Sequence, residues 1–358
     1  MSEPPPASCA VCGKKQSLLL CSACRVIHYC SSDHQIKHRP GHKAACNTIK
    51  KAKQLVETEE ARLRKTELDC AVALSFATYK YAKSLYTARA LLFQALTSID
   101  TKASLQAQLD DLHRLFLLGP HHVLFARYYL PALMIRLGKD QECYDLIKWF
   151  RAAIDIPDED WATETSLGVT VKDADPFQPD RIAIGGQSEL DLKIHQALVK
   201  VRLCLDVEAL HSLSEAIKPY VLQTSIIASK PEIVEANDHK ADGTALIGIL
   251  LVQLSFLMLM VHSENPHFWA ALTSPSALDY SKQRLQMDSC IDKSWKSNSP
   301  EMAEALVKMN IDAWLSTPRA LDFVREKWGT ILRNNEKHGI PMPRDPFSNP
   351  MPGNCPAM

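Results

Sequence analysis

Apolar residues recur at every third or fourth position along much of the chain after residue 66. The spacing holds from Leu68 to Ile99 and again over residues 103–118. This period places apolar side chains on one face of an α-helix, whereas a half-buried strand would alternate them. The pattern therefore predicts helices over both stretches, with one break in the longer stretch.

A helical hairpin is predicted by the segment LPALMIRLGKDQECYDLIKWF, residues 130–150. Gly138 lies where the first helix would end, and glycine adopts the left-handed C-cap conformation at no steric cost. The segment resembles one hairpin of a tetratricopeptide-like repeat, but no second copy follows at a fixed period. With only 12 glycines in 358 residues, we expect an all-α main body, a tetratricopeptide-like helical-hairpin array, rather than a barrel or sandwich.

Further helices are predicted from Glu189 onward. Ser299 and Pro300 have the residue types of an N-cap and a first helical position. Residues 244–261 carry no charge over 18 positions, which is long enough for a membrane-spanning helix. Gln253 lies in the middle of this stretch, and Lys and Arg do not cluster at its ends. We therefore expect a fully buried central helix there, with a membrane segment as the alternative.

Composition divides the chain into segments. We expect a disordered tail at residues 1–8, a cysteine-rich module at 9–46, a charged linker helix at 47–66, a first helical part at 67–154, an acidic loop at 155–188, a second helical part at 189–340 and a disordered proline-rich tail at 341–358. Proline, glycine and acidic residues interrupt every apolar period in the acidic loop. This loop is therefore predicted to be either a solvated connector or a lid or docking strand.

Charge and cysteine content bound the functional class. The chain carries 41 Lys and Arg against 41 Asp and Glu, so a charge argument for nucleic acid must be local. The first residues, MSEPPPAS, lack a basic stretch followed by an apolar one. We therefore expect no secretory signal and an intracellular location, in the cytoplasm, the nucleus or both. In a reducing compartment the 11 cysteines are not expected to pair as disulfides.

Six of the 11 cysteines fall within the first 46 residues, where two C-x2-C pairs precede two Cys/His pairs spaced by four residues. A tight turn lets both thiolates of a C-x2-C pair face one zinc ion, and residues at i and i+4 lie one helical turn apart. Four such pairs make two closed tetrahedral sites, which leave no position for a catalytic water. The predicted ligands of two structural Zn²⁺ ions are Cys9, Cys12, Cys21, Cys24, Cys30, His34, His42 and Cys46.

The order C-x2-C, C-x2-C, Tyr-Cys, a ligand four residues on, Gln and H-x3-C resembles the MYND-type zinc finger over residues 9–46, about a tenth of the chain. The resemblance implies an interleaved cross-brace, in which the first and third ligand pairs share one zinc ion and the second and fourth share the other. The implied sets are Cys9, Cys12, Cys30 and His34, and Cys21, Cys24, His42 and Cys46.

Two positions depart from the usual MYND pattern. His34 stands where a cysteine is usual, but imidazole is an acceptable zinc ligand. His38, one turn further on, could replace it; the family spacing favours His34, and Pro40-Gly41 is expected to break the helix after His38. The family often grips a short proline-rich peptide with a Gln and, four residues later, a Trp. Gln35 matches the first and Arg39 replaces the second. The resemblance implies a partner-facing surface there, and the arginine in place of an aromatic residue predicts a preference for peptides that carry an acidic residue.

Residues 9–50 hold seven Lys and Arg against Asp33 alone, which raises the alternative of a DNA-associated transcription regulator. We interpret these charges instead as groups that solubilise a small domain and offset the zinc-thiolate centres. A groove-reading ββα finger would also need a different ligand order. The partners expected are therefore other proteins, bound through short peptide motifs, and neither nucleic acid nor a membrane.

No nucleotide-binding, hydrolase or metalloprotease motif occurs in the chain. MYND fingers also occur inside SET-type lysine methyltransferases, the second alternative, but those enzymes carry an Asn-His-Ser-Cys-type segment downstream that this chain lacks. The sequence therefore predicts a non-enzymatic interaction protein or scaffold, in which the finger and the helical body bind partner proteins in transcriptional or regulatory complexes.

Overall fold

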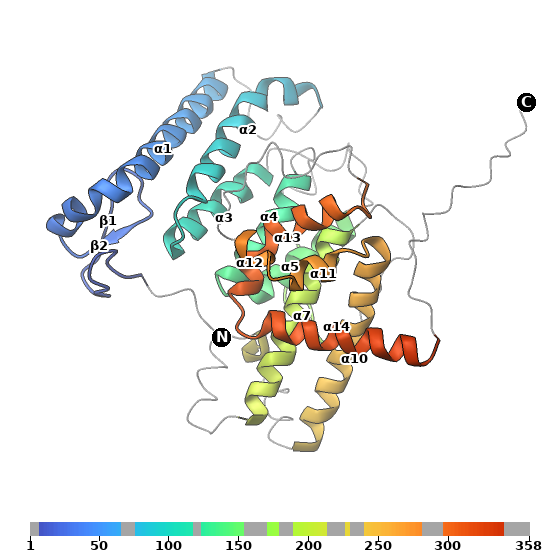
Figure 1. The fold of residues 1–358 in the computed structure, drawn as a ribbon. Helices are drawn as coiled ribbons and strands as arrows, with labels where there is room; N and C mark the ends of the chain where they lie inside the picture. The colour runs from blue at the N-terminus through green and yellow to red at the C-terminus, as the bar shows by residue number, and fades with distance from the viewer. Residues whose placement is uncertain are drawn as a thin grey trace, which may run out of the picture.

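The computed structural model describes residues 7–65, 76–116, 123–153, 170–178, 189–212, 226–229, 240–280 and 296–339 (Figure 1). These residues form an all-α body with a small module of Cys and His clusters at its N-terminal end, as the sequence predicts. Some predictions lie outside the described residues: residues 1–6 of the predicted tail at 1–8, the whole predicted tail at 341–358, residues 68–75 of the first predicted helix, and most of the acidic loop.

A small antiparallel sheet begins the fold. β1 is Leu19–Leu20 and β2 is His28–Tyr29, with Leu19 opposite Tyr29 and Leu20 opposite His28. Two-residue strands are too short to be stable alone. The stability of this sheet therefore depends on the residues that pack around it.

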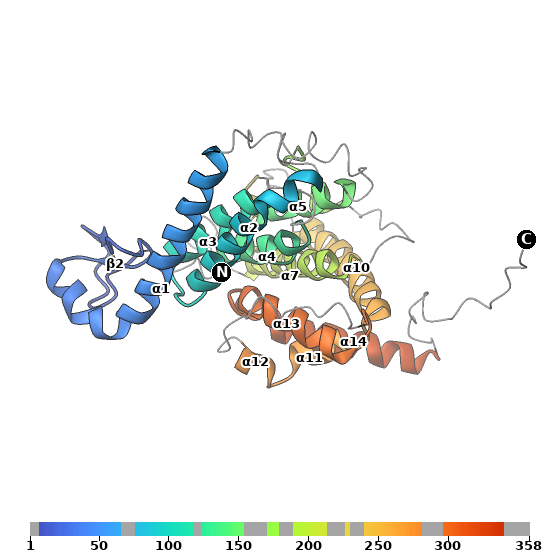
Figure 2. The ribbon, with the colours of Figure 1, turned by 90° about the horizontal axis from the view of Figure 1, so that it is seen from above.

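α1 runs without interruption from Ser32 to Lys65, so the segment predicted as a separate linker helix, 47–66, continues a helix that begins inside the finger. The expected break at Pro40-Gly41 is wrong, because Pro40 lies within the helix with its ring exposed. A proline inside a helix removes one backbone hydrogen bond and bends the axis. Accordingly, the first turns of α1 curve around the sheet before the straight rod begins (Figure 2).

Two helices pack beside the rod. α2 (Phe76–Leu96) lies against α1, and α3 (Lys102–Phe116) lies against α2 (Figure 1). They correspond to the helices predicted within 68–99 and at 103–118. Thr101 begins α3, since its hydroxyl accepts a hydrogen bond from the backbone N–H of Ser104 at 3.1 Å.

The helical hairpin is confirmed. α4 is Val123–Arg136 and α5 is Asp140–Ala153. Gly138 has a φ of +73°, and the N–H groups of Gly138 and Lys139 donate to carbonyl groups in the last turn of α4 at 3.0 and 2.9 Å. This pair of bonds is the Schellman motif, which ends a helix at a left-handed glycine. The likeness to a tetratricopeptide repeat rests on this one hairpin and stays a prediction.

The second half of the body surrounds a central helix, α7 (Leu190–Ser212). This helix contacts α4 and α5 and two later helices, α10 (Lys240–Glu264) and α14 (Ala320–Lys337). Ser299 caps α13 as predicted, because its hydroxyl accepts the N–H of Met302 at 3.2 Å. α13 packs against α4 and α11 and so joins the two halves of the chain. The elements after α7 are η2 (Ile226–Ser229), α10 (Lys240–Glu264), α11 (Phe268–Thr273), α12 (Ala277–Tyr280), α13 (Pro300–Leu315) and α14 (Ala320–Lys337).

Residues 170–178, the described part of the predicted acidic loop, are held against α7 and α10. Lys200 of α7 donates to the carbonyl oxygen of Pro176, and Gln253 of α10 donates to that of Phe177 at 2.7 Å. Lys200 also donates to the side-chain oxygen of Gln253 at 2.6 Å. The one amide in the middle of the apolar stretch 244–261 thus satisfies the backbone of a crossing segment.

α10 differs from the fully buried helix expected over residues 244–261. It is long and apolar enough to cross a membrane by length and composition alone, yet only 28% of its apolar window is buried. Leu250, Leu254 and Met258 belong to the main core, whereas Val252 is 71% exposed. The expectation of burial on all sides is therefore wrong: α10 packs along one face.

Arg89 of α2 links the first three helices. Its guanidinium is almost fully buried and donates to Asp111 of α3 and to Glu60 of α1. A buried charge is stable only where it is paired and hydrogen-bonded. The three side chains therefore set the position of α1, and with it the finger, relative to α2 and α3.

We expect Asp111→Ala to lower the free energy of unfolding by about 3 kcal/mol, because it leaves the buried Arg89 with too little compensating charge. The control is Asp322→Ala, which removes an exposed carboxylate paired with Arg325 and should change stability by less than about 0.5 kcal/mol. Urea unfolding followed by far-UV circular dichroism measures both variants. Similar losses for the two would contradict the role given to Arg89.

Candidate metal centre

Two turns of the same shape present the C-x2-C pairs. The N–H of Gly13 donates to the carbonyl of Cys9, and the N–H of Arg25 donates to that of Cys21, both at 2.9 Å. Gly13 and Arg25 directly follow the second cysteine of each pair and have φ values of +73° and +58°. Glycine adopts this left-handed conformation freely, whereas Arg25 does so at a cost of about 1 kcal/mol. The repeated turn explains why both pairs offer their thiols in the same manner.

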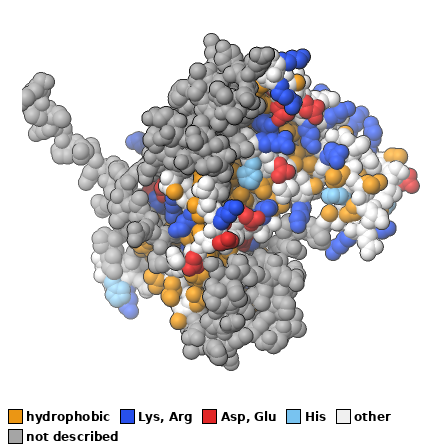
Figure 3. Space-filling view, turned by 180° about the vertical axis from the view of Figure 1, so that it is seen from behind, with side chains coloured by type: hydrophobic (Ala, Val, Ile, Leu, Met, Phe, Trp, Pro, Cys, Tyr) orange, Lys and Arg blue, Asp and Glu red, His pale blue; other side chains and the backbone are white. Residues whose placement is uncertain are grey.

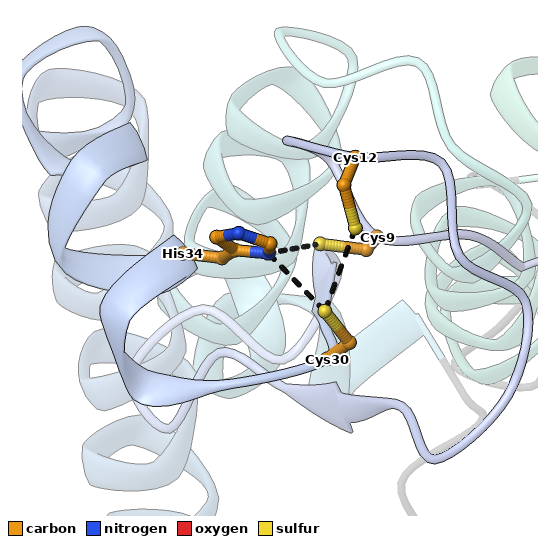
Figure 4. Close-up of side chains that lie close together, drawn as sticks. All are labelled: Cys9, Cys12, Cys30 and His34. Atoms are coloured by element: carbon orange, nitrogen blue, oxygen red, sulfur yellow. Dashed lines mark hydrogen bonds between the residues drawn. The ribbon is translucent and has the colours of Figure 1, made fainter.

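The turn Cys9–Gly13 is called the first turn below, and the turn Cys21–Arg25 the second turn. Site 1 consists of Cys9 and Cys12 from the first turn, Cys30 directly after β2, and His34 near the start of α1 (Figure 4). His34 Nδ1 lies 3.4 Å from Cys9 Sγ and 3.1 Å from Cys30 Sγ. Cys12 Sγ completes the group at 3.5 Å from Cys30 Sγ. The four side chains converge on one point from three segments of the chain (Figure 4).

Site 2 consists of Cys21, Cys24, His42 and Cys46, all of which are buried. Cys21 Sγ lies 3.7 Å from Cys46 Sγ, and Cys24 Sγ lies 3.4 Å from His42 Nε2. The second turn supplies one half of the site and the part of α1 beyond Pro40 supplies the other. All eight predicted ligands are thus brought together, in the interleaved sets that a cross-brace requires.

Both sets have the dimensions of a tetrahedral zinc site. Ligands about 2.0–2.3 Å from a central zinc ion are about 3.3–3.8 Å from one another. The contacts given above run from 3.1 to 3.7 Å, and the ligand atoms of each set all lie within 4.8 Å of one another. Thiolate and imidazole donors also favour zinc over hard cations such as Mg²⁺ or Ca²⁺. The two sets therefore fit two structural zinc ions.

The acidity of the thiols depends on their surroundings. Burial raises the pKa of Cys24 to about 12, and burial together with the neighbouring Cys12 thiol raises that of Cys30 to about 11. Burial acts in the same direction on Cys9, but backbone N–H groups, those of Val11 and Cys12 first, outweigh it and lower the pKa to about 5. Because zinc binds thiolates, loading either site releases protons.

The choice between His34 and His38 is settled by their positions. His34 faces the first turn, while His38 Nδ1 lies 2.9 Å from the hydroxyl of Tyr29. The His38 ring stacks on that of His42, with centroids 5.6 Å apart and planes 4° from parallel. His38 therefore lies outside both ligand sets and packs against a ligand of site 2.

Gln35 and Arg39 lie in the part of α1 that belongs to the finger. The side-chain amide of Gln35 approaches Cys21 Sγ at 3.8 Å, so it can donate to a thiolate of site 2. Arg39 is exposed. The partner-facing role predicted for both residues stays a prediction.

Two polar contacts that tie the finger to the body were not predicted. Lys53 of α1 donates to the carbonyl oxygen of Cys24 at 2.7 Å. Thr101 donates to that of Val26 at 2.5 Å, across 75 positions of sequence. A lysine in a charged helix and a threonine before a helix are common residues at such places. Neither one signals a bond to a distant segment.

Residues 9–46 match the family model of the MYND finger. The N-terminal module is a MYND finger. It accounts for about a tenth of the chain, and comparisons of the whole chain with curated proteins and with solved structures gave no match. A MYND finger is a zinc-binding protein–protein interaction module, so the geometry of the two sites and the family assignment agree.

We expect His34→Ala to weaken the zinc of site 1 at least about 100-fold, because it removes one of four ligands. His38→Ala, on the same face one turn later, should keep both ions bound. Native mass spectrometry of each variant in the presence of a competing chelator measures the zinc content. Loss of zinc from His38→Ala, with two ions retained by His34→Ala, would reverse the ligand assignment.

Proposed function

We propose that this protein is a non-enzymatic scaffold whose MYND finger binds short peptide segments of partner proteins. The finger's exposed surface supports this proposal. Leu19 and Leu20 of β1 and Ile36 of α1 are large apolar side chains left exposed. Within the described part of the chain, β1 pairs with β2 alone, so one edge of the sheet can accept an extended peptide.

Charge on the finger supports a preference for acidic peptides. Lys and Arg side chains recur over the visible face of the finger, next to apolar ones (Figure 3). Arg39, in place of the aromatic residue usual in the family, is exposed and has no acidic neighbour within four residues along α1. A peptide carboxylate can pair with this guanidinium while its backbone adds to the sheet.

The helical body contributes by holding the finger in one orientation. α1 passes from the finger into the body without a break, and Arg89 fixes it against α2 and α3. A partner peptide therefore meets a surface that is already in place, which lowers the entropy lost on binding. We propose transcriptional or regulatory complexes inside the cell, in the cytoplasm or nucleus, as the setting.

Arg39→Ala tests the peptide mode. The probe is a pair of fluorescent proline-rich peptides that differ only by Asp or Asn at one position, titrated into the zinc-loaded full chain. We expect Arg39→Ala to weaken the Asp peptide about two- to five-fold, the value of an exposed ion pair, and to leave the Asn peptide unchanged. Arg64→Ala is the control, because Arg64 is an exposed arginine at the other end of the same helix.

Equal weakening of both peptides by Arg39→Ala, or no weakening of either, would contradict the proposed acidic preference. Failure of every peptide to bind the zinc-loaded chain would contradict the peptide mode itself. If Arg64→Ala weakened binding of the Asp peptide as much as Arg39→Ala does, the result would show only a general effect of net charge.

The basic finger supports a second candidate, binding to DNA. Residues 9–50 carry seven basic residues and one acidic residue. A salt series of DNA affinity separates the two candidates, because each phosphate contact adds about one unit to the slope of log affinity against log salt. Affinity in the micromolar range or tighter near physiological salt, with a steep slope, would favour DNA over peptides.

A methyltransferase remains the enzymatic alternative to a scaffold. Calorimetric titration of the full chain with the methyl donor S-adenosylmethionine distinguishes them. The scaffold proposal expects no heat of binding, whereas saturable binding at micromolar concentration would favour the enzyme.

A further inference from the structure

The two zinc sites lie at different depths. All four ligands of site 2 are buried, whereas site 1 has one buried ligand, two half-buried ligands and the exposed Cys12. Three of the site 2 ligands, Cys21, Cys24 and Cys46, also belong to a hydrophobic cluster that continues into the body. Among the described residues of that cluster there is no ligand of site 1.

Site 2 shares one helix face with the body. His42 and Cys46 are followed on the buried side of α1 by Ile49, Val56 and Leu63 at helical spacing. These residues pack with side chains of α2, namely Leu85, Ala88, Leu92, Ala95 and Leu96. The interior of the finger and the α1–α2 interface therefore form one continuous core.

Pro40 separates the helical ligands of the two sites. His34 of site 1 precedes it, and His42 of site 2 follows it. A proline removes one of the backbone hydrogen bonds that would join these turns. The hydrogen bonds from Lys53 and Thr101 reach Cys24 and Val26, on the site 2 side of the finger.

We propose that site 2 is the joint between the finger and the helical body, and that site 1 is an exchangeable metal site whose loss leaves this joint intact. Cys21 and Cys24 would hold a zinc ion of site 2 together with His42 and Cys46 of α1, and this link would stabilise α1 on α2 outside the finger. Cys9 and Cys12 would be ordered by the zinc ion that they share with Cys30 and His34 in site 1. The exposed Cys12 would leave that ion open to a competing ligand. This inference is independent of which partner the finger binds.

The first test follows zinc release from the intact, zinc-loaded chain into excess pyridylazoresorcinol, a chromophoric chelator. We expect two phases of equal amplitude, with the second slower by at least about ten-fold, because release from site 2 requires opening of the shared core. Iodoacetamide added between the phases, followed by peptide mass spectrometry, should label Cys9, Cys12 and Cys30 and spare Cys21, Cys24 and Cys46.

The second test compares matched serine variants by amide hydrogen exchange. Cys12→Ser should keep one zinc ion and normal protection across α2, whereas Cys24→Ser should lose protection in α2 as well as in the finger. A Cys24→Ser chain that does not fold, beside a Cys12→Ser chain that does, is the extreme form of the same result. The proposal is overturned by release in a single phase, by labelling of all six cysteines together, or by equal loss of α2 protection in both variants.

Discussion

The structure depends on the packing of the four ligands of site 2 onto one face of the long helix α1. His42 and Cys46 stand on the side of α1 that continues as the hydrophobic contact with α2. A module of about 40 residues buries too little apolar surface to fold without help. Here two sources of stability act on the same helix: zinc ligation at one end and the α1–α2 core along the rest. The finger is therefore built into the body rather than attached through a linker.

This joint has consequences for recognition. An interaction module on a flexible tether searches for its partner in many orientations, whereas in the proposed peptide mode this finger would present its sheet edge in one orientation. The proline at position 40 allows the helix to curve around the small sheet and still continue as a straight rod. Ligands on both sides of the proline offset the hydrogen bond that it removes. Site 1, whose helical ligand His34 precedes this proline, includes the exposed Cys12.

Buried charges organise the body in a comparable way. Arg127 of α4 pairs with Asp191 of α7, and Arg202 of α7 pairs with Asp140 of α5 while donating to Thr317 at 2.7 Å. Such pairs contribute little net stability, since desolvation offsets much of their attraction. Their geometry is nevertheless demanding, because a misplaced helix would leave a charge unpaired. Together with the Arg89 group, they restrict how α1–α3 and the later helices can pack.

The features that the sequence by itself determined are those that depend on contacts between residues close together along the chain. The identity of the zinc ligands, the turn at Gly138 and the cap at Ser299 each depend on residues within a few positions of one another, so their spacing contains the answer. Two features depended instead on distant segments. Pro40 ends no helix because ligands on both sides hold it. Val252 is exposed because, within the described part of the chain, the neighbouring helices bury the opposite face of α10, where Leu250, Leu254 and Met258 lie. In each case the deciding contact comes from a part of the chain that no local pattern can place, and only tertiary packing brings it there.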